Sequence, residues 1–169
     1  MRWDELFADL QAQFAATATA QAHLEVAELA EAEMAATTLS DRWRAKRRQE
    51  LWLRLRDGTD RTGTVADVAQ EWIVLAAGPR RTLIPRHAVV LARPLGHSAP
   101  PPSRVESALG LGHVLRAMAQ EQLDVVVHTV AGIYRGRFTR VGGDHCDVVT
   151  GSTVATIAWS GLITVESGA

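Results

Sequence analysis

The chain lacks both the cysteine pairs of secreted proteins and the long apolar runs of membrane proteins. Its 169 residues include one cysteine, Cys146, so no disulfide can form within the chain. Residues 1–5 do not have the basic and then apolar order of a signal peptide. Uncharged apolar runs, such as residues 72–77, are far shorter than the roughly 20 residues that span a bilayer. We therefore expect a cytoplasmic protein without a membrane partner.

Sequence motifs of catalysis and metal binding are scarce as well. The sequence contains neither a Gly-x-Ser-x-Gly nucleophile motif nor a glycine-rich phosphate loop that ends in Lys-Ser or Lys-Thr. Residues 144–147 cluster four potential metal ligands, but alternate residues of a strand face opposite ways, so Cys146 would point away from His145 and Asp147. We expect a protein that is not an enzyme and has no catalytic residue, metal or cofactor. We interpret Cys146 as a buried structural thiol.

Residues 3–36 contain no glycine or proline and are rich in alanine, glutamate, glutamine and leucine, which predicts a long helix. Such a helix would be about 50 Å long. Large apolar side chains recur at helical spacing near its start: Trp3, Leu6, Phe7, Leu10 and Phe14. This stripe either packs on the rest of the chain or forms an oligomer or partner interface. Residues 15–22 offer only Ala, Thr and Gln, so they do not extend it into a regular coiled coil.

Charge is divided unevenly along the chain. The net charge is −1, but residues 1–38 hold one base and seven acids, so this segment carries −6 and the remainder +5. Basic side chains cluster within residues 42–48, with tryptophans in and after the cluster. This combination is typical of nucleic-acid binding, but a basic segment would also serve as the counter-surface of an acidic segment such as residues 25–33. The candidate binding residues are Arg42, Trp43, Arg44, Lys46, Arg47, Arg48 and, further along the chain, Arg86.

From residue 51 the apolar period changes from helical to alternating, which predicts short strands separated by Gly, Pro or Gln. Five such strands suggest a small closed barrel. The prolines after residue 93 predict a semi-rigid linker, and a helical pattern over 105–120 and further strands follow it. The predicted segments are a long acidic helix at 1–38, a short helix and barrel at 39–93, a linker at 94–104, and a second helix and barrel at 105–169.

An internal repeat relates the two predicted barrels. A shift of 73 aligns residues 63–92 with residues 136–165 without a gap, and apolar positions meet apolar positions throughout. The first strands, at 51–55 and 123–127, align at a shift of 72 instead. One hairpin should therefore differ in length by a residue, which is a change that hairpin turns tolerate readily.

A helix, then a long bent hairpin with glycine at the entry of its second strand, and then a short Ile-Pro-type strand resembles the Sm-like fold. This is the fold of the spliceosomal Sm proteins and the bacterial Hfq-like RNA chaperones. The resemblance rests on residues 51–91 and 123–165 and covers about half of the chain. Within them, residues 63–65 (Gly-Thr-Val) and 136–138 (Gly-Arg-Phe) match the glycine-x-hydrophobic start of the family's second strand. It implies two tandem Sm-like or SH3-like five-stranded β-barrels, each preceded by a short helix, behind the long N-terminal helix.

The functional residues of the Sm-like family are not retained. Its first motif has an Asp and then an Asn where this chain has Ala69 and Ile73, and later Gly142 and Cys146. The base-reading asparagine is therefore missing in both copies. Arg86 follows Pro85 in place of the Arg-Gly pair of the second motif.

These features favour a non-catalytic interaction or assembly protein built on the duplicated barrels. Its partner would be protein, either a second copy of the chain or another protein. We expect a homo-oligomer, because tandem copies in one chain can build a pseudo-symmetric ring from fewer subunits. The alternative is an Sm-like RNA-binding protein that uses the basic cluster at 42–48.

Overall fold

The computed structural model describes residues 2–97 and 100–167; within the first helix the described side chains are those of Asp9 and residues 11–36. Two compact units make up the chain, Met1–Thr37 and Thr38–Ala169. The first unit is a single helix. The second holds all ten strands and three short helices of the described residues.

The helix of the first unit, α1, spans Arg2–Ala36, as the sequence predicts. At 1.5 Å per residue its 35 residues extend about 50 Å. Thr17 and Thr19 lie in its middle, and their hydroxyls donate to the backbone carbonyl oxygens of Gln13 and Ala15. These hydrogen bonds accommodate the β-branched residues without a break in the helix. Every described side chain of α1 is exposed.

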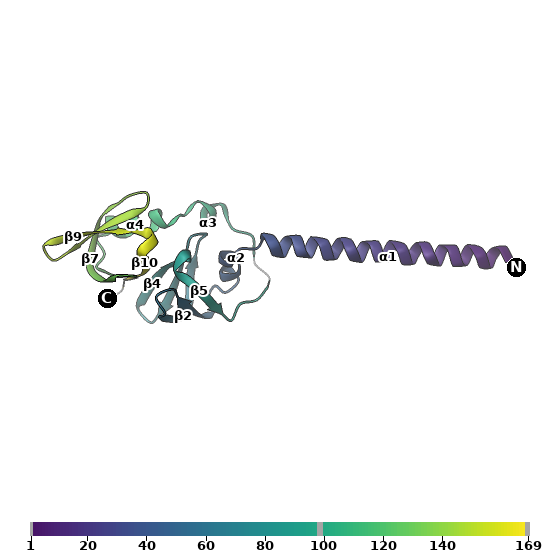
Figure 1. Ribbon diagram of the computed structural model, residues 1–169, viewed down its shortest axis with the longest axis horizontal. Coiled ribbons are helices and arrows are strands. Elements are labelled where there is room, and N and C mark those ends of the chain that lie inside the picture. Colours follow the sequence, from purple (N-terminus) through teal and green to yellow (C-terminus); the bar gives the residue numbers. More distant parts are fainter. Residues whose placement is uncertain (1, 98–99, 168–169) are drawn as a thin grey trace. The chain divides into compact units, whose positions relative to one another are not determined.

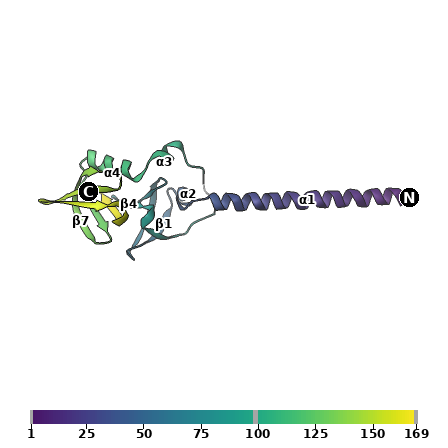
Figure 2. The same ribbon diagram turned by 45° about the horizontal axis from the view of Figure 1, so that its top comes forward.

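The strands of the second unit form one antiparallel sheet (Figures 1 and 2), in the order β5-β1-β2-β3-β4-β10-β6-β7-β8-β9. The strands are β1 (Glu50–Leu55), β2 (Asp60–Val68), β3 (Trp72–Ala77), β4 (Arg80–Pro85), β5 (Val89–Arg93), β6 (Val125–Thr129), β7 (Gly132–Val141), β8 (His145–Thr150), β9 (Thr153–Ala158) and β10 (Leu162–Ser167). A mainly β fold with helices is therefore confirmed. The predicted pair of closed five-stranded barrels is wrong.

The first half of the sheet is β1–β5 and the second half is β6–β10. Neither half forms a closed barrel, because its fourth and fifth strands do not pair with each other. In the first half, β4 pairs with β10, which places Leu83 opposite Val165, while β5 pairs with β1. In the second half, β10 pairs with β6 and β4, and β9 pairs with β8. The result is a continuous open sheet with β5 and β9 at its two edges.

The short helices differ in length from the predicted ones. The short helix predicted at the start of residues 39–93 is α2 (Leu39–Arg44); it ends there because Arg47 already bridges to β2 and β1 begins at Glu50. The helix predicted over 105–120 is divided into α3 (Arg104–Ala108) and α4 (Leu111–Gln120). Gly110 is extended at this break, and the Leu111 N–H donates to Glu71 Oε2 at 2.7 Å.

Several local features recur at an offset of 73 residues. A bulge lies between Val65 and Asp67 of β2, and another lies between Phe138 and Arg140 of β7. A 3₁₀ turn follows the fourth strand of each half, η1 (Arg86–Ala88) and η2 (Trp159–Gly161). The two halves therefore share the bend of their second strand and the connection between their last two strands.

The first strands correspond at a different offset from the predicted 72. Leu51 lies opposite Gly63, and Val125 lies opposite Gly136, so Val125 occupies the place of Leu51, 74 residues later. The second hairpin is shorter than the first, because Thr129 pairs with Gly132 across a two-residue turn. The first hairpin has a three-residue loop, closed by the Leu55 N–H that donates to Thr59 O.

Two apolar clusters form the core, and each includes side chains from the other half. The cluster of the second half, which includes Leu115 of α4 and Phe138 of β7, also contains Ala69, Trp72 and Leu83 of the first half. The cluster of the first half, which includes Trp43 of α2, also contains Ile163 of β10. The pairing of β4 with β10 is therefore sealed by an exchange of core side chains.

Candidate functional site

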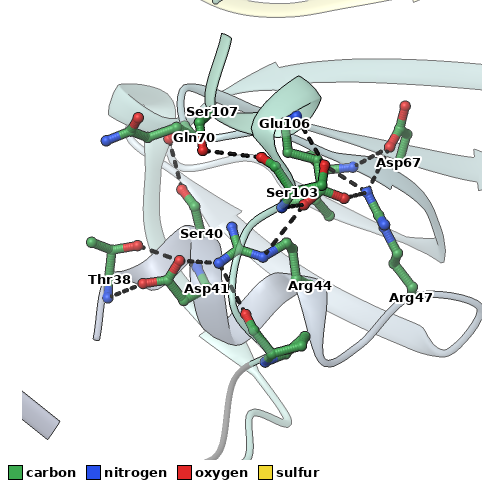
Figure 3. Close-up of polar contacts among 12 residues, drawn as sticks. Thr38, Ser40, Asp41, Arg44, Arg47, Asp67, Gln70, Ser103, Glu106 and Ser107 are labelled. Carbon is green, nitrogen blue, oxygen red and sulfur yellow. Dashed lines mark hydrogen bonds and ion pairs between the residues drawn. The ribbon is translucent and has the colours of Figure 1, made fainter. Parts of the chain in front are cut away.

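The centre of the predicted basic surface is a buried arginine. Arg44, in the last turn of α2, is 5% exposed. Its guanidinium donates to Asp41 Oδ1 and, at 3.2 Å, to the carbonyl oxygen of Pro100. Arg44 Nε lies 3.8 Å from Glu106 Oε2 in α3. Figure 3 shows Asp41 of α2 and Glu106 of α3 beside Arg44.

Glu106 links this buried arginine to a second one. Its carboxylate lies 2.5 Å from Arg47 Nη2, and the same Arg47 nitrogen donates to Asp67 Oδ1 of β2 at 3.0 Å. Glu106 also accepts the Ser103 N–H at 2.9 Å, which completes the capping box of α3. The Ser103 N–H and then Arg47 hold the pKa of Glu106 below its ordinary value, although burial opposes the shift.

These contacts fasten the segment that follows the prolines to the first half of the sheet. Two arginines and three carboxylates alternate in one network, so most of its charge is compensated internally. Arg42 contributes a further link, since its Nε donates to Gly96 O at 2.8 Å. The network holds α3 and the proline-containing segment before it against the first half of the sheet. The density of basic residues in the sequence does not indicate this role.

Other members of the predicted basic surface lie in different environments. Trp43 is fully buried in the core of the first half, so its ring offers no surface on which a base could stack. Arg48 is exposed, and its backbone adopts a left-handed conformation with φ of 63°. Lys46 donates to Gln49 Oε1 at 3.3 Å. The ring of Trp52 lies on β1, with the guanidinium of Arg93 4.1 Å from its centroid.

Arg86 lines a cavity of about 490 Å³ beside the β4–β10 pair. The cavity walls come from both 3₁₀ turns, from the starts of α2 and α4 and from the turn before β3: Leu39, Glu71, Arg86, His87, Leu111, Trp159 and Ser160. His87 Nε2 lies 3.0 Å from Leu162 O, and burial lowers the pKa of this imidazole. Arg86 itself is exposed.

The predicted helix interface is described only at Phe14, whose side chain is 76% exposed. The side chains of Trp3, Leu6, Phe7 and Leu10 lie outside the described residues. Further along α1, large apolar side chains are also exposed at Leu24, Val26, Leu29 and Met34. These four do not continue the N-terminal stripe at regular spacing, so the apolar period does not predict them as part of an interface.

The open edges of the sheet are the features that the sequence analysis missed. β9 has the sequence Thr-Val-Ala-Thr-Ile-Ala, without proline or charge, and β5 begins with four apolar residues. Val90 of β5 is 67% exposed. Uncharged edge strands are a recognisable sequence signal, but only once the strand order shows which strands are the edges.

Cys146 has the environment expected of a structural thiol. It is fully buried in β8, and burial, together with the charge of Asp147, raises the pKa of its thiol to about 12. Within residues 2–97 and 100–167, no group of three or more His, Cys, Asp or Glu side chains is arranged to hold a metal. In the same part of the chain no helix combines the length and apolar character needed to cross a bilayer.

No protein-family model matches this chain, and no curated protein matches its sequence.

Proposed function

We propose that this protein is a non-catalytic interaction and assembly protein, in which the ten-stranded sheet is a rigid body and α1 provides contacts to a partner. The observation that carries this role is the exposure of α1. All of its described side chains are exposed, including large apolar ones at Phe14, Leu24 and Leu29. A long helix that buries none of these side chains in its own unit gains most of its stability from a second surface.

The surroundings of the Cys146 thiol and of the charged side chains in α2 and α3 support a non-catalytic role. The thiol of Cys146 is buried and its pKa is raised, which suppresses the thiolate that a nucleophile requires. Arg44 forms ion pairs with Asp41 of α2 and Glu106 of α3. We call this set of ion pairs between α2 and α3 the clamp. The shared positions of the bulge and the 3₁₀ turn support the proposal that the two halves arose by duplication of one unit.

RNA binding through the basic cluster is the second candidate, and exposed Arg48 and Arg86 favour it. It has weaker support, because Trp43 is buried and Arg44 and Arg47 already contact carboxylates. An RNA-binding protein would carry excess 260 nm absorbance when purified at low salt and release it as the salt concentration rises. Arg48→Ala together with Arg86→Ala would then weaken retention on RNA and lower its salt dependence.

The assembly role is tested by removing α1. The mass of the full chain and of a chain lacking residues 1–37 is measured by light scattering. We expect the full chain to have a multiple of the single-chain mass of 18.3 kDa, and the shortened chain to have a smaller multiple. The shortened chain should retain its β-rich circular dichroism, because residues 38–169 form a compact unit. An unchanged multiple in the shortened chain would contradict a role of α1 in assembly.

A variant that keeps the helix provides a sharper form of the same test. Phe14, Leu24 and Leu29 are each replaced by Ala, which preserves helix propensity and removes exposed apolar surface. The matched control replaces three exposed polar residues of α1 by Ala, namely Gln11, Gln13 and Gln21. We expect the apolar set to lower the mass in solution and the control set to leave it unchanged.

A further inference from the structure

A second cavity of about 490 Å³ lies across strands of both halves of the sheet, away from the 3₁₀ turns. Its walls include Arg80 at the start of β4, Glu166 in β10, Val126 in β6 and Arg135 in β7. These four strands are consecutive neighbours in the sheet. The cavity therefore depends on the pairing of β4 with β10, which brings the two halves together.

The side chains of this cavity form a row across one face of the sheet. Glu166 lies opposite Thr82 of β4 on one side and opposite Val126 of β6 on the other. Val126 lies in turn opposite Arg135 of β7. Directly opposed residues of antiparallel strands have their side chains on the same face, and Arg80 shares this face because it is two residues from Thr82 along β4. The face thus has an arginine at each end and a carboxylate between them.

Both carboxylates that line the cavity already have basic partners. Glu166 Oε1 lies 3.4 Å from Arg61 Nη2 of β2 and 3.5 Å from His128 Nε2 of β6. Asp124, directly before β6, accepts hydrogen bonds from Arg137 Nε at 2.7 Å and from Arg137 Nη2 at 3.1 Å. The acidic charge of the cavity is therefore compensated by side chains that lie around it.

The two arginines of the cavity have no such compensation. Among the described residues no acidic side chain forms an ion pair with Arg80 or Arg135, and both arginines are exposed. Their strands are separated by β10 and β6, so three strand spacings, or about 14 Å, lie between the two backbones. Two positive charges therefore stand at opposite ends of one cavity.

We propose that this cavity binds a small dicarboxylate, with one carboxylate on Arg80 and the other on Arg135. A planar guanidinium matches a carboxylate through two parallel hydrogen bonds. Glu166 and Val126 lie between the arginines, so the middle of the ligand carries no negative charge. A compact anion such as phosphate contacts only one of two arginines at this separation. The site goes beyond the proposed assembly role and uses no residue of α1.

A ligand at this position connects the two halves of the sheet, because Arg80 belongs to the first half and Arg135 to the second. It contacts both arginines only while β4 is paired with β10. Since such a ligand binds the folded chain and not the unfolded one, it raises the melting temperature of the second unit as its concentration increases. A monocarboxylate, held by one arginine, has a smaller effect.

The test is isothermal titration calorimetry of the full-length chain with glutarate, a linear dicarboxylate, and with butyrate, which lacks the second carboxylate. Both are titrated at low ionic strength, which limits screening of the arginine charges, and up to about 10 mM, which covers weak ligands. We expect glutarate to bind about tenfold or more tightly than butyrate, because a hydrogen-bonded charge contact is worth at least that factor.

Two variants assign the binding to the cavity. Arg135→Gln keeps a long polar side chain and removes one of the two charges, so it should weaken glutarate binding about tenfold or more and remove the preference over butyrate. Arg140→Gln makes the same change of charge at an exposed residue of β7 that does not line the cavity. This control should bind glutarate as the parent chain does.

Three outcomes would overturn the proposal. Absence of glutarate binding removes the site, as does an equal loss of affinity in the Arg135→Gln and Arg140→Gln chains. Inorganic phosphate that binds more tightly than glutarate, and does so through Arg135, overturns the choice of a dicarboxylate. All of these are binding measurements, so they are decided separately from the mass measurements that test the role of α1.

Discussion

Leu83 and Ile163 lie on neighbouring strands and each packs into the core of the other half of the sheet. Both are almost completely buried, with exposures of 1% and 0%. Because each core includes side chains of the other half, the β4–β10 junction couples the stability of the two halves. The second unit should unfold in one step rather than as two small domains.

Truncation of either exchanged side chain should destabilise the whole second unit. Leu83→Ala or Ile163→Ala leaves a cavity in a packed core, which typically costs about 2–5 kcal/mol. Urea unfolding followed by circular dichroism measures the loss. Val105→Ala, at an exposed position in α3, should change the free energy of unfolding by no more than about 0.5 kcal/mol. Two separate transitions in the Leu83→Ala chain would contradict the coupling of the halves.

Gly136 of β7 should be intolerant of any side chain. A Cβ at this position would lie 1.7 Å from the carbonyl oxygen of Val149 on β8, a distance that no packing adjustment of a side chain relieves. Gly136→Ala should therefore destabilise the chain by about 2 kcal/mol or more in urea unfolding. Gly143→Ala is the control, because a Cβ there meets nothing within 4 Å. Equal stability of the two variants would show that β8 can move away from β7.

The long helix and the strands could be predicted from the sequence, because each depends on local composition and on the period of apolar residues. The closed barrels could not be predicted correctly. A period-two pattern shows which side chains of a strand are buried but not which strand lies beside it, so it does not distinguish a β4–β5 pair from a β4–β10 pair. The same limit explains the offset of the first strands. A slip of two residues, from 72 to 74, leaves every side chain on its original face.

The role of the basic cluster depended on partners that are remote in the sequence. Arg44 and Arg47 are close to one another along the chain, which suggests an exposed basic surface. Their carboxylate partner Glu106 lies about sixty residues later, on a helix that reaches them only in the fold. No spacing rule connects residues at that separation, so the clamp could be recognised only in the structure.

The clamp should make stability depend on pH in the acidic range. The pKa of Glu106 is held below its ordinary value of 4.5, so this carboxylate contributes stability that is fully present above that value. The contribution is lost as the pH falls through the lowered pKa, because the folded chain must then take up a proton that the unfolded chain already holds. Burial alone would raise the pKa of the Asp41 carboxyl, but the Thr38 N–H and Arg44 lower this pKa on balance. Asp41 therefore also stabilises the fold above its ordinary pKa, and this contribution is lost in acid.

Thermal unfolding between about pH 3 and pH 6 measures this dependence, since the carboxylates titrate in that range. Glu106→Gln removes the charge that Arg44 and Arg47 contact, so its melting temperature should fall less steeply with acid than that of the parent chain. Glu28→Gln makes the same change of net charge at an exposed position of α1. This control should reproduce the slope of the parent chain, and a Glu106→Gln chain with that same slope would contradict the clamp.

Cys146 should be unreactive in the folded chain and should link stability to alkaline pH. Its thiol is fully buried and its pKa is raised from 9.0 to about 12, so native protein should react with a thiol reagent only as it unfolds. Above pH 9.0 the unfolded chain releases the thiol proton and the folded chain retains it, so stability declines as the pH rises. Cys146→Val keeps an apolar side chain of similar volume at a cost below about 1.5 kcal/mol and should abolish this part of the alkaline decline. Labelling rates in increasing urea provide the independent measurement: rapid labelling without denaturant would show that β8 opens locally and that the burial of the thiol is not maintained in solution.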